Sequence, residues 1–137
     1  MTGPAHLLDT NAAIDLLADP ACAATLGTAP TAVSALTEIE VRRGVAVRAH
    51  DPAAVVQRVD LLNGLLTRWS PIPVDARVAA AYSRVVAAVV ASGQQPRPRV
   101  VDHLIAATAL AHGLTLVTAD RTLLNGVAGL VPTTSLP

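Results

Sequence analysis

The sequence predicts an α/β domain built on a central, mostly parallel sheet of four or five strands. Short apolar runs alternate with segments of helical periodicity, and this alternation implies right-handed crossovers that cover both faces of a sheet. The length of 137 residues, 52% of them hydrophobic, suits one domain with one core. We therefore expect residues 1–137 to form a single three-layer domain, whose ligands bind beyond the carboxyl ends of the strands.

The first half of the chain is expected to contain two strands and three helices. Ala5–Asp9 is a candidate for a buried strand because its apolar run is bounded by Pro4 and a polar turn, and Thr31–Leu36 is the second candidate. A further helical turn or two is expected over residues 20–26. The start of the third helix has the clearest signal, an N-cap aspartate followed by proline. The expected helices are Asn11–Ala18, Thr37 to about Arg48, and Asp51 towards Trp69.

The second half is expected to supply the remaining strands. Pro71–Val74 and Leu114–Val117 are the third and fourth candidates, and Val131–Thr134 is a candidate edge strand. The segments between them are a helix over Ala76–Ala91 capped by Asp75, a loop over Ser92–Arg99, a helix over Val100–His112 that Gly113 ends, and a turn with a short helix over Thr118–Leu124.

The composition excludes several classes of protein. No apolar run approaches the roughly 18 residues that span a bilayer. The N-terminus lacks the features of a signal peptide and Cys22 is the only cysteine, so we expect a cytoplasmic protein with no membrane partner. The net charge of zero gives no global argument for nucleic-acid binding. All ten basic residues are arginine, and the absence of lysine argues against P-loop NTPases and aspartyl-nucleophile phosphohydrolases.

Four acidic residues are expected at one edge of the sheet. Asp9 follows the first strand, Glu40 lies in the helix after the second, Asp120 follows the fourth, and Asp102 begins the helix before it. Taken singly, each has an ordinary explanation: an N-cap for Asp9, a capping box opened by Thr37 for Glu40, the helix dipole for Asp102 and a turn for Asp120. The shared edge distinguishes them from the other acidic residues, which have no common location.

Carboxylates gathered in this way repel one another and raise one another's pKa, so a cation is needed to compensate. Mg²⁺ and Mn²⁺ prefer carboxylate and water oxygens as ligands. None of the four histidines pairs up at a ligand spacing, which argues against zinc, and His103 is interpreted as a partly exposed helix residue. The sequence therefore predicts a magnesium or manganese site.

Three blocks of the sequence also resemble the motifs of a known family. A strand that ends in Asp and then Thr or Ser is matched by LLDTN. A Glu four residues before a Gly is matched within VSALTEIEVRRG by Glu40 and Gly44. The most specific block is VVDHLIAATALAHGLTLVTAD, which supplies Asp102, Thr118 and Asp120. The chain resembles a PIN domain, and most closely a VapC-type ribonuclease toxin.

This resemblance implies a PIN-like α/β/α sandwich that cleaves RNA phosphodiester bonds with Mg²⁺ or Mn²⁺ and so inhibits translation. It also implies a homodimer and a small cognate antitoxin that blocks the site. The alternative that stays open is a catalytically inactive PIN-like scaffold that only binds RNA or protein. Titration with Mn²⁺ would separate the two, since the scaffold would bind none.

The candidate site residues have different expected roles. Asp9 and Asp102 are expected to bind the metal directly, whereas Glu40 and Asp120 bind it directly or through water. Hydrogen bonds from neighbouring side chains would orient these carboxylates. The residues expected to do so are Thr10, Asn11 and Thr118, and the residues expected to contact RNA phosphates are Arg97 and Arg99.

Overall fold

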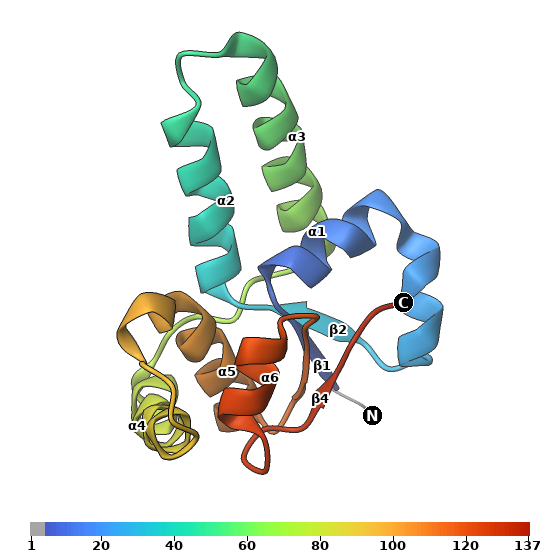
Figure 1. Cartoon of the computed structure of the whole chain (residues 1–137). Coiled ribbons are helices and arrows are strands. Elements are labelled where there is room, and N and C mark those ends of the chain that lie inside the picture. The colour runs from blue at the N-terminus through green and yellow to red at the C-terminus, as the bar shows by residue number, and fades with distance from the viewer. Residues whose placement is uncertain (1–4) are drawn as a thin grey trace.

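The computed structural model describes residues 5–137 and contains a four-stranded, wholly parallel sheet in the order β2-β1-β3-β4 (Figure 1). Pro4, the predicted boundary of the first strand, lies outside the described residues. The predicted fold class, an α/β/α sandwich around a parallel sheet, is confirmed. The strands are β1 (His6–Leu8), β2 (Thr31–Val33), β3 (Thr115–Val117) and β4 (Thr133–Thr134).

The helices lie close to the ranges that the sequence predicts. Asp51 and Asp75 act as N-caps, accepting hydrogen bonds from backbone N–H groups of the first turn. Neither Gly44 nor the Asn63-Gly64 pair interrupts its helix. The helices are α1 (Thr10–Ala18), α2 (Ala35–Val47), α3 (Pro52–Arg68), α4 (Ala76–Ala91), α5 (Val100–His112) and α6 (Arg121–Val127), with short 3₁₀ helices η1 (Pro20–Leu26) and η2 (Arg97–Arg99).

Successive strand residues point to opposite faces of the sheet, and this alternation divides the core in two. Leu7 and Leu116 pack on the face covered by α4, α5 and α6. Leu8 and Val117 pack on the face covered by α1, η1 and α3. Figure 1 shows the α2–α3 hairpin standing out from these layers. None of the helices within residues 5–137 combines the length and hydropathy that crossing a bilayer requires.

Two predictions about the middle of the chain are wrong. Pro71–Val74 forms no strand; Ile72 alone pairs, through an isolated bridge to Ser34, because the prolines on either side lack the N–H that a ladder needs. The helix expected from Thr37 begins earlier, at Ala35, and its N-cap is Ser34, whose Oγ accepts a hydrogen bond from the Leu36 N–H at 3.1 Å. Thr37 and Glu40 therefore form no capping box.

The end of α5 allows a test of backbone conformation. Gly113 adopts φ 65° and ψ 34°, a left-handed conformation that costs other residues about 1–2 kcal/mol. We expect Gly113→Ala to lower the free energy of unfolding by about 1 kcal/mol in urea denaturation. Gly44→Ala is the control: its added Cβ would meet only the Arg58 side chain at 3.7 Å, so the variant should be stabilised by about 0.5–1 kcal/mol. Equal effects at both positions would contradict this account.

Candidate active site

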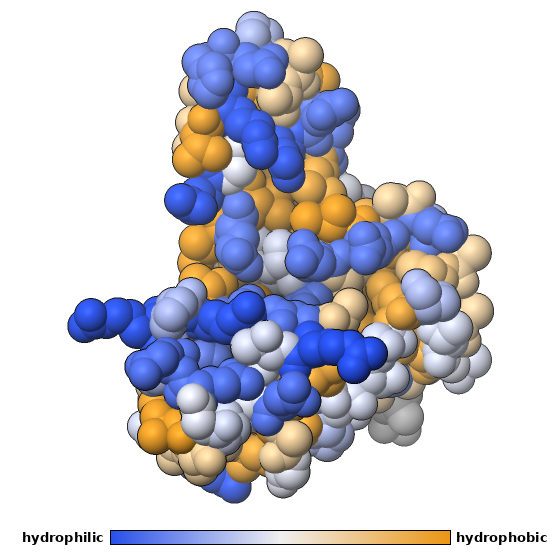
Figure 2. All heavy atoms as spheres, in the orientation of Figure 1, coloured by the Kyte–Doolittle hydropathy of each residue, from blue (hydrophilic) through white to orange (hydrophobic). Residues whose placement is uncertain are grey.

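The candidate site lies where the chain changes direction across the sheet. From β1 the chain crosses to β2 on one side, and from β3 it crosses to β4 on the other, so the carboxyl ends of β1 and β3 flank a topological switch point. Asp9 directly follows β1, and Asp120 follows β3 by three residues. Figure 2 shows hydrophilic side chains gathered across this part of the surface, between the base of the α2–α3 hairpin and α6.

Asp9 is both a helix cap and the most buried of the four carboxylates. Its side chain caps α1, accepting a hydrogen bond from the Ala12 N–H at 2.9 Å on Oδ1, and the residue is only 8% exposed. Burial raises the pKa of Asp9, and the charges of Asp102 and Asp120 raise it further, against the opposing effect of the Thr118 hydroxyl and the Ala12 N–H. The ionised form of Asp9 is therefore less favourable here than it is in water.

Glu40 approaches the same place from α2. The Thr10 hydroxyl, in the first turn of α1, donates a hydrogen bond to Glu40 Oε1. Thr10 also lies 3.2 Å from the hydroxyl of the fully buried Thr37. These contacts fix Glu40 against the start of α1 and give Thr37 a role that the expected capping box did not suggest.

Asp102 stands in the first turn of α5, where the helix dipole favours negative charge. Partial burial raises the pKa of its carboxyl, and the charges of Glu40 and Asp120 add to that effect. The charge of Arg99, whose Nη1 lies 3.6 Å from Asp102 Oδ2, acts in the opposite direction. The four carboxylates thus share one electrostatic environment, although they come from four separate parts of the chain.

Asp120 is held by a cap and by an arginine. Its Oδ1 accepts hydrogen bonds from the backbone N–H groups of Thr122 and Leu123, and its Oδ2 accepts one from Arg99. Burial alone would raise the pKa of Asp120, but the bonds from Arg99 and the backbone outweigh it and lower the pKa. The Thr118 Oγ1 in turn accepts a hydrogen bond from the Asp120 N–H at 3.1 Å. Asp120 is consequently ionised and fixed to protein donors.

As these side chains stand, they do not yet form a metal cage. Within residues 5–137, no three Asp, Glu, His or Cys side chains are drawn together closely enough to hold an ion. Asp9 is turned to a helix N-terminus, Glu40 to Thr10, and Asp120 to Arg99.

Comparison with known proteins identifies the family. A profile of the PIN domain matches residues 6–129. The chain belongs to the PIN-domain family. Ribonuclease VapC4 of Mycobacterium tuberculosis is 35% identical to this PIN domain over 89 residues, a match that spans 65% of the chain and 65% of the length of that relative.

Solved structures show the same fold. VapBC-5 of Mycobacterium tuberculosis, from a family of toxin–antitoxin systems, superposes on this PIN domain with a TM-score of 0.73 and 27% identity, covering 97% of this chain and 98% of that one. VapBC2 of Rickettsia felis, solved bound to a DNA fragment from its promoter, gives a TM-score of 0.76 at 20% identity over 96% of this chain and 98% of that one. The similarity to VapBC2 of Rickettsia felis is a similarity of fold alone.

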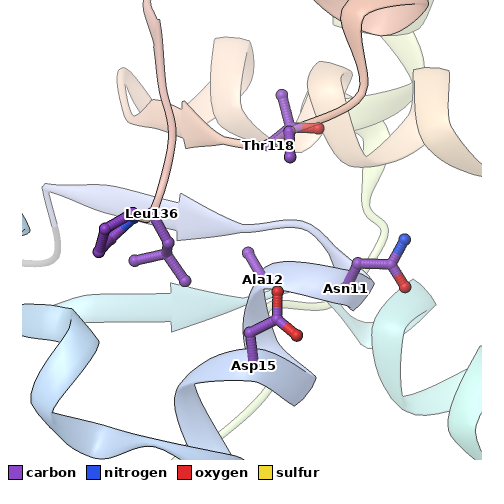
Figure 3. Close-up of a pocket in the computed structure, with 7 residues that line it drawn as sticks. Asn11, Ala12, Asp15, Thr118 and Leu136 are labelled. Atoms are coloured by element: carbon purple, nitrogen blue, oxygen red, sulfur yellow. The ribbon is translucent and has the colours of Figure 1, made fainter.

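The other residues predicted for the site lie in different surroundings. Thr10 and Thr118 contact the carboxylate cluster of this PIN domain, but Asn11 forms no hydrogen bond to it within the described chain. Asn11 instead lines a small hollow of about 90 Å³ with Asp15, Thr118 and Leu136. Figure 3 shows the Asn11 amide and the Thr118 hydroxyl turned the same way, away from Leu136, on the side of the hollow opposite the C-terminal segment.

His103, Arg97 and Arg99 differ in their burial and in their ion pairs. His103 is fully buried, contrary to the prediction of a partly exposed residue, because α5 runs through the core, and this burial lowers its pKa. Arg97 is exposed on η2 and forms no ion pair within residues 5–137. Arg99, two residues on, is half-buried against Asp102 and Asp120. Of the two arginines, Arg99 alone is therefore part of the site. Its pairing with Asp120 joins residues that are distant in sequence.

Proposed function

We propose that this PIN domain is a Mg²⁺- or Mn²⁺-dependent endoribonuclease that acts as the toxin of a toxin–antitoxin pair. The observation that carries the proposal is the meeting of four carboxylates at the carboxyl ends of the two central strands. Similarity to Ribonuclease VapC4 supports RNA as the substrate. By cutting RNA in the cytoplasm, the protein would inhibit translation.

The chemistry of the donors fits a hard divalent cation. Asp9 and Asp102 would hold the ion directly, and Glu40 and Asp120 would do so directly or through water. A nearby cation favours the ionised form of a carboxylate, so it would offset the burial and repulsion that raise the pKa of Asp9 and Asp102. When bound, the ion would supply a water of lowered pKa and charge compensation for the scissile phosphate.

The chain's own residues would hold this geometry. Asp9 is fixed at the end of a buried strand and by its cap on α1, so its carboxylate starts from a rigid position. Thr10 orients Glu40, and Thr118 fixes the backbone of Asp120. Asp9 and Asp120 cap α1 and α6, and the other two carboxylates lie within α2 and α5. The site therefore depends on how these four helices pack in the domain.

A hollow in the surface suits the expected antitoxin. It lies between α1 and α3, is open to solvent, has a volume of about 360 Å³, and is lined mainly by apolar groups, among them Ile14, Leu17 and Leu61. Orange side chains mark the junction of α1 and α3 in Figure 2. The apolar face of an antitoxin helix would fit such a hollow. A homodimer of the toxin is part of the same proposal, since the resemblance of the sequence to VapC-type toxins implies one.

The proposal is tested by cleavage of a labelled RNA with the purified protein. Cleavage should require Mg²⁺ or Mn²⁺ and stop in EDTA. Glu40→Gln should reduce the rate by about 10²-fold or more, because it removes a charge from the metal environment. Glu38→Gln is the matched control on the same helix: Glu38 pairs with Arg42 at 2.7 Å, away from the cluster, and its loss should leave cleavage unchanged.

Two results would count against the enzyme. Cleavage that persists in EDTA would remove the metal from the reaction. RNA binding without cleavage, together with no Mn²⁺ uptake in calorimetry, would favour the inactive scaffold. Equal rates for Glu40→Gln and Glu38→Gln would show that the α2 carboxylate is not part of the site.

A further inference from the structure

The Arg99 side chain lies between two of the four carboxylates. Its Nη1 donates a hydrogen bond to Asp120 Oδ2 and lies 3.6 Å from Asp102 Oδ2. Asp102 lies in α5, which begins directly after Arg99, whereas Asp120 follows β3 and is distant in sequence. The three side chains therefore meet only in the folded domain. The three side chains are between 33% and 37% exposed. This is a partly desolvated charge cluster.

Within the described residues, Arg99 is the arginine that pairs with the cluster. Its charge lowers the pKa of Asp102 and Asp120, whereas the neighbouring carboxylates raise those of Asp9 and Asp102. A metal ion at the same carboxylates would supply the same compensation with a higher charge. Arg99 and the metal would then compete for the same two carboxylates, Asp102 and Asp120.

We infer that Arg99 is an internal counterion which competes with the metal for Asp102 and Asp120 and, once displaced, binds a phosphate of the RNA. The inference rests on the proposed function. Arg99 is a positioning residue without the metal, since one nitrogen of its guanidinium pairs with both Asp102 and Asp120. Displacement would leave its guanidinium beside the metal, where its planar array of donors can bind a phosphate with two hydrogen bonds.

The local backbone suits such an exchange. Arg99 ends η2, which contains Pro98 and follows Pro96, and α5 begins at the next residue. Proline fixes φ and limits movement of this segment. The long arginine side chain can therefore change partner by rotation while its backbone stays in place. Arg97, on the same turn but exposed and unpaired in the described chain, lacks a carboxylate to exchange.

The competition is tested by calorimetric titration of the full chain with Mn²⁺ in the absence of RNA. Because Arg99→Gln removes the competing cation, it should bind Mn²⁺ about 3- to 10-fold more tightly than the wild type. Arg97→Gln, the matched control, should bind Mn²⁺ as the wild type does. Arg99→Gln should also lower the Tm of the metal-free protein, and saturating Mn²⁺ should close that gap.

The results of the Mn²⁺ titration distinguish a failure of this inference from a failure of the proposed function. Equal or weaker Mn²⁺ binding by Arg99→Gln would overturn the inference and leave the metal site intact. No Mn²⁺ binding by the wild type would overturn both. In cleavage assays at saturating Mn²⁺, the displaced arginine predicts a higher KM for RNA in Arg99→Gln, with little change in kcat. An unchanged KM would contradict the phosphate contact.

A measurement on the wild type avoids dependence on the folding of a variant. In an NMR titration with the diamagnetic ion Mg²⁺, the guanidinium resonances of Arg99 should shift as its carboxylate partners are taken over. Those of Arg97 should stay in place. Arg99 resonances that do not respond while Mg²⁺ binds would overturn the exchange.

Discussion

Asp9→Asn is expected to reduce RNA cleavage by on the order of 10³-fold, because it removes a direct ligand of the proposed metal. The substitution keeps the shape of the side chain and an oxygen that can accept the Ala12 N–H, so α1 should keep its cap. Loss of cleavage with an unchanged circular dichroism spectrum would support Asp9 as a ligand. Full activity in Asp9→Asn would contradict that role.

The same variant should be more stable than the wild type at neutral pH in EDTA. Burial raises the pKa of Asp9 above its ordinary value of 3.8, so the folded protein binds this proton more tightly than the unfolded chain does. The stabilisation from this group is complete below pH 3.8 and is lost as the pH rises through the folded-state pKa. Asparagine carries no charge, and its advantage over aspartate should therefore appear at pH 7 and vanish in acid.

Urea denaturation in EDTA at several pH values measures how the difference in free energy of unfolding between Asp9→Asn and the wild type depends on pH. A difference that grows as the pH falls would contradict the expected loss of the advantage in acid. Mn²⁺ should raise the Tm of the wild type and have little effect on Asp9→Asn. Asp51→Asn is the matched control, since Asp51 caps α3 through the Ala54 N–H at 3.3 Å and lies far from the cluster; cleavage should not change.

The sequence predicts the sheet well where an apolar run is free to pair. The runs at β1 and β3 consist of residues with backbone N–H groups and end in polar residues, and both became central strands. The run at Pro71–Val74 has similar hydropathy, but its prolines leave only Ile72 able to join the sheet. The positions of the prolines, rather than hydropathy, would have been the better signal.

Side-chain surroundings were harder to predict because they depend on contacts distant in sequence. The Arg99–Asp102 spacing is visible in the sequence as an i,i+3 pair, but the bond from Arg99 to Asp120 requires β3 to pack back along α5. His103 was expected to be partly exposed, yet α5 is covered on most sides by the sheet, α4 and α6. A helix rich in alanine, as α5 is, permits such close packing, and this composition was the available signal.

The start of α2 shows how two reasonable caps compete. Ser34 and Thr37 both have the side chain of an N-cap, and the Thr37–Glu40 spacing matches a capping box. The Ala35 N–H donates a hydrogen bond to the Ile72 carbonyl, so the chain turns into the helix directly after β2 and Ser34 becomes the cap. Glu40 is thereby left free of capping, and its carboxylate reaches Thr10. A local rule was overridden here by pairing with a distant segment.

Leu8→Ala is expected to have the largest effect on stability, lowering the free energy of unfolding by about 2–5 kcal/mol. Leu8 is fully buried in the central strand, pairs with Val33 and Val117 on the two neighbouring strands, and packs in the core beneath α1. Truncation would leave a cavity among the buried side chains of this core. A domain of this kind typically has only about 5–15 kcal/mol of stability to lose.

The comparison that tests this account is Leu66→Ala, on α3, where the side chain is 39% exposed and the loss should be below about 1 kcal/mol. Because Asp9 directly follows Leu8, the cavity should reduce cleavage mainly by lowering the folded fraction. Cleavage per folded molecule of Leu8→Ala should therefore approach the wild-type rate at low temperature. A persistent loss in the fully folded variant would instead mean that the Leu8 side chain, and not only the strand backbone, sets the position of the Asp9 carboxylate. A loss of stability equal to that of Leu66→Ala would contradict the burial argument.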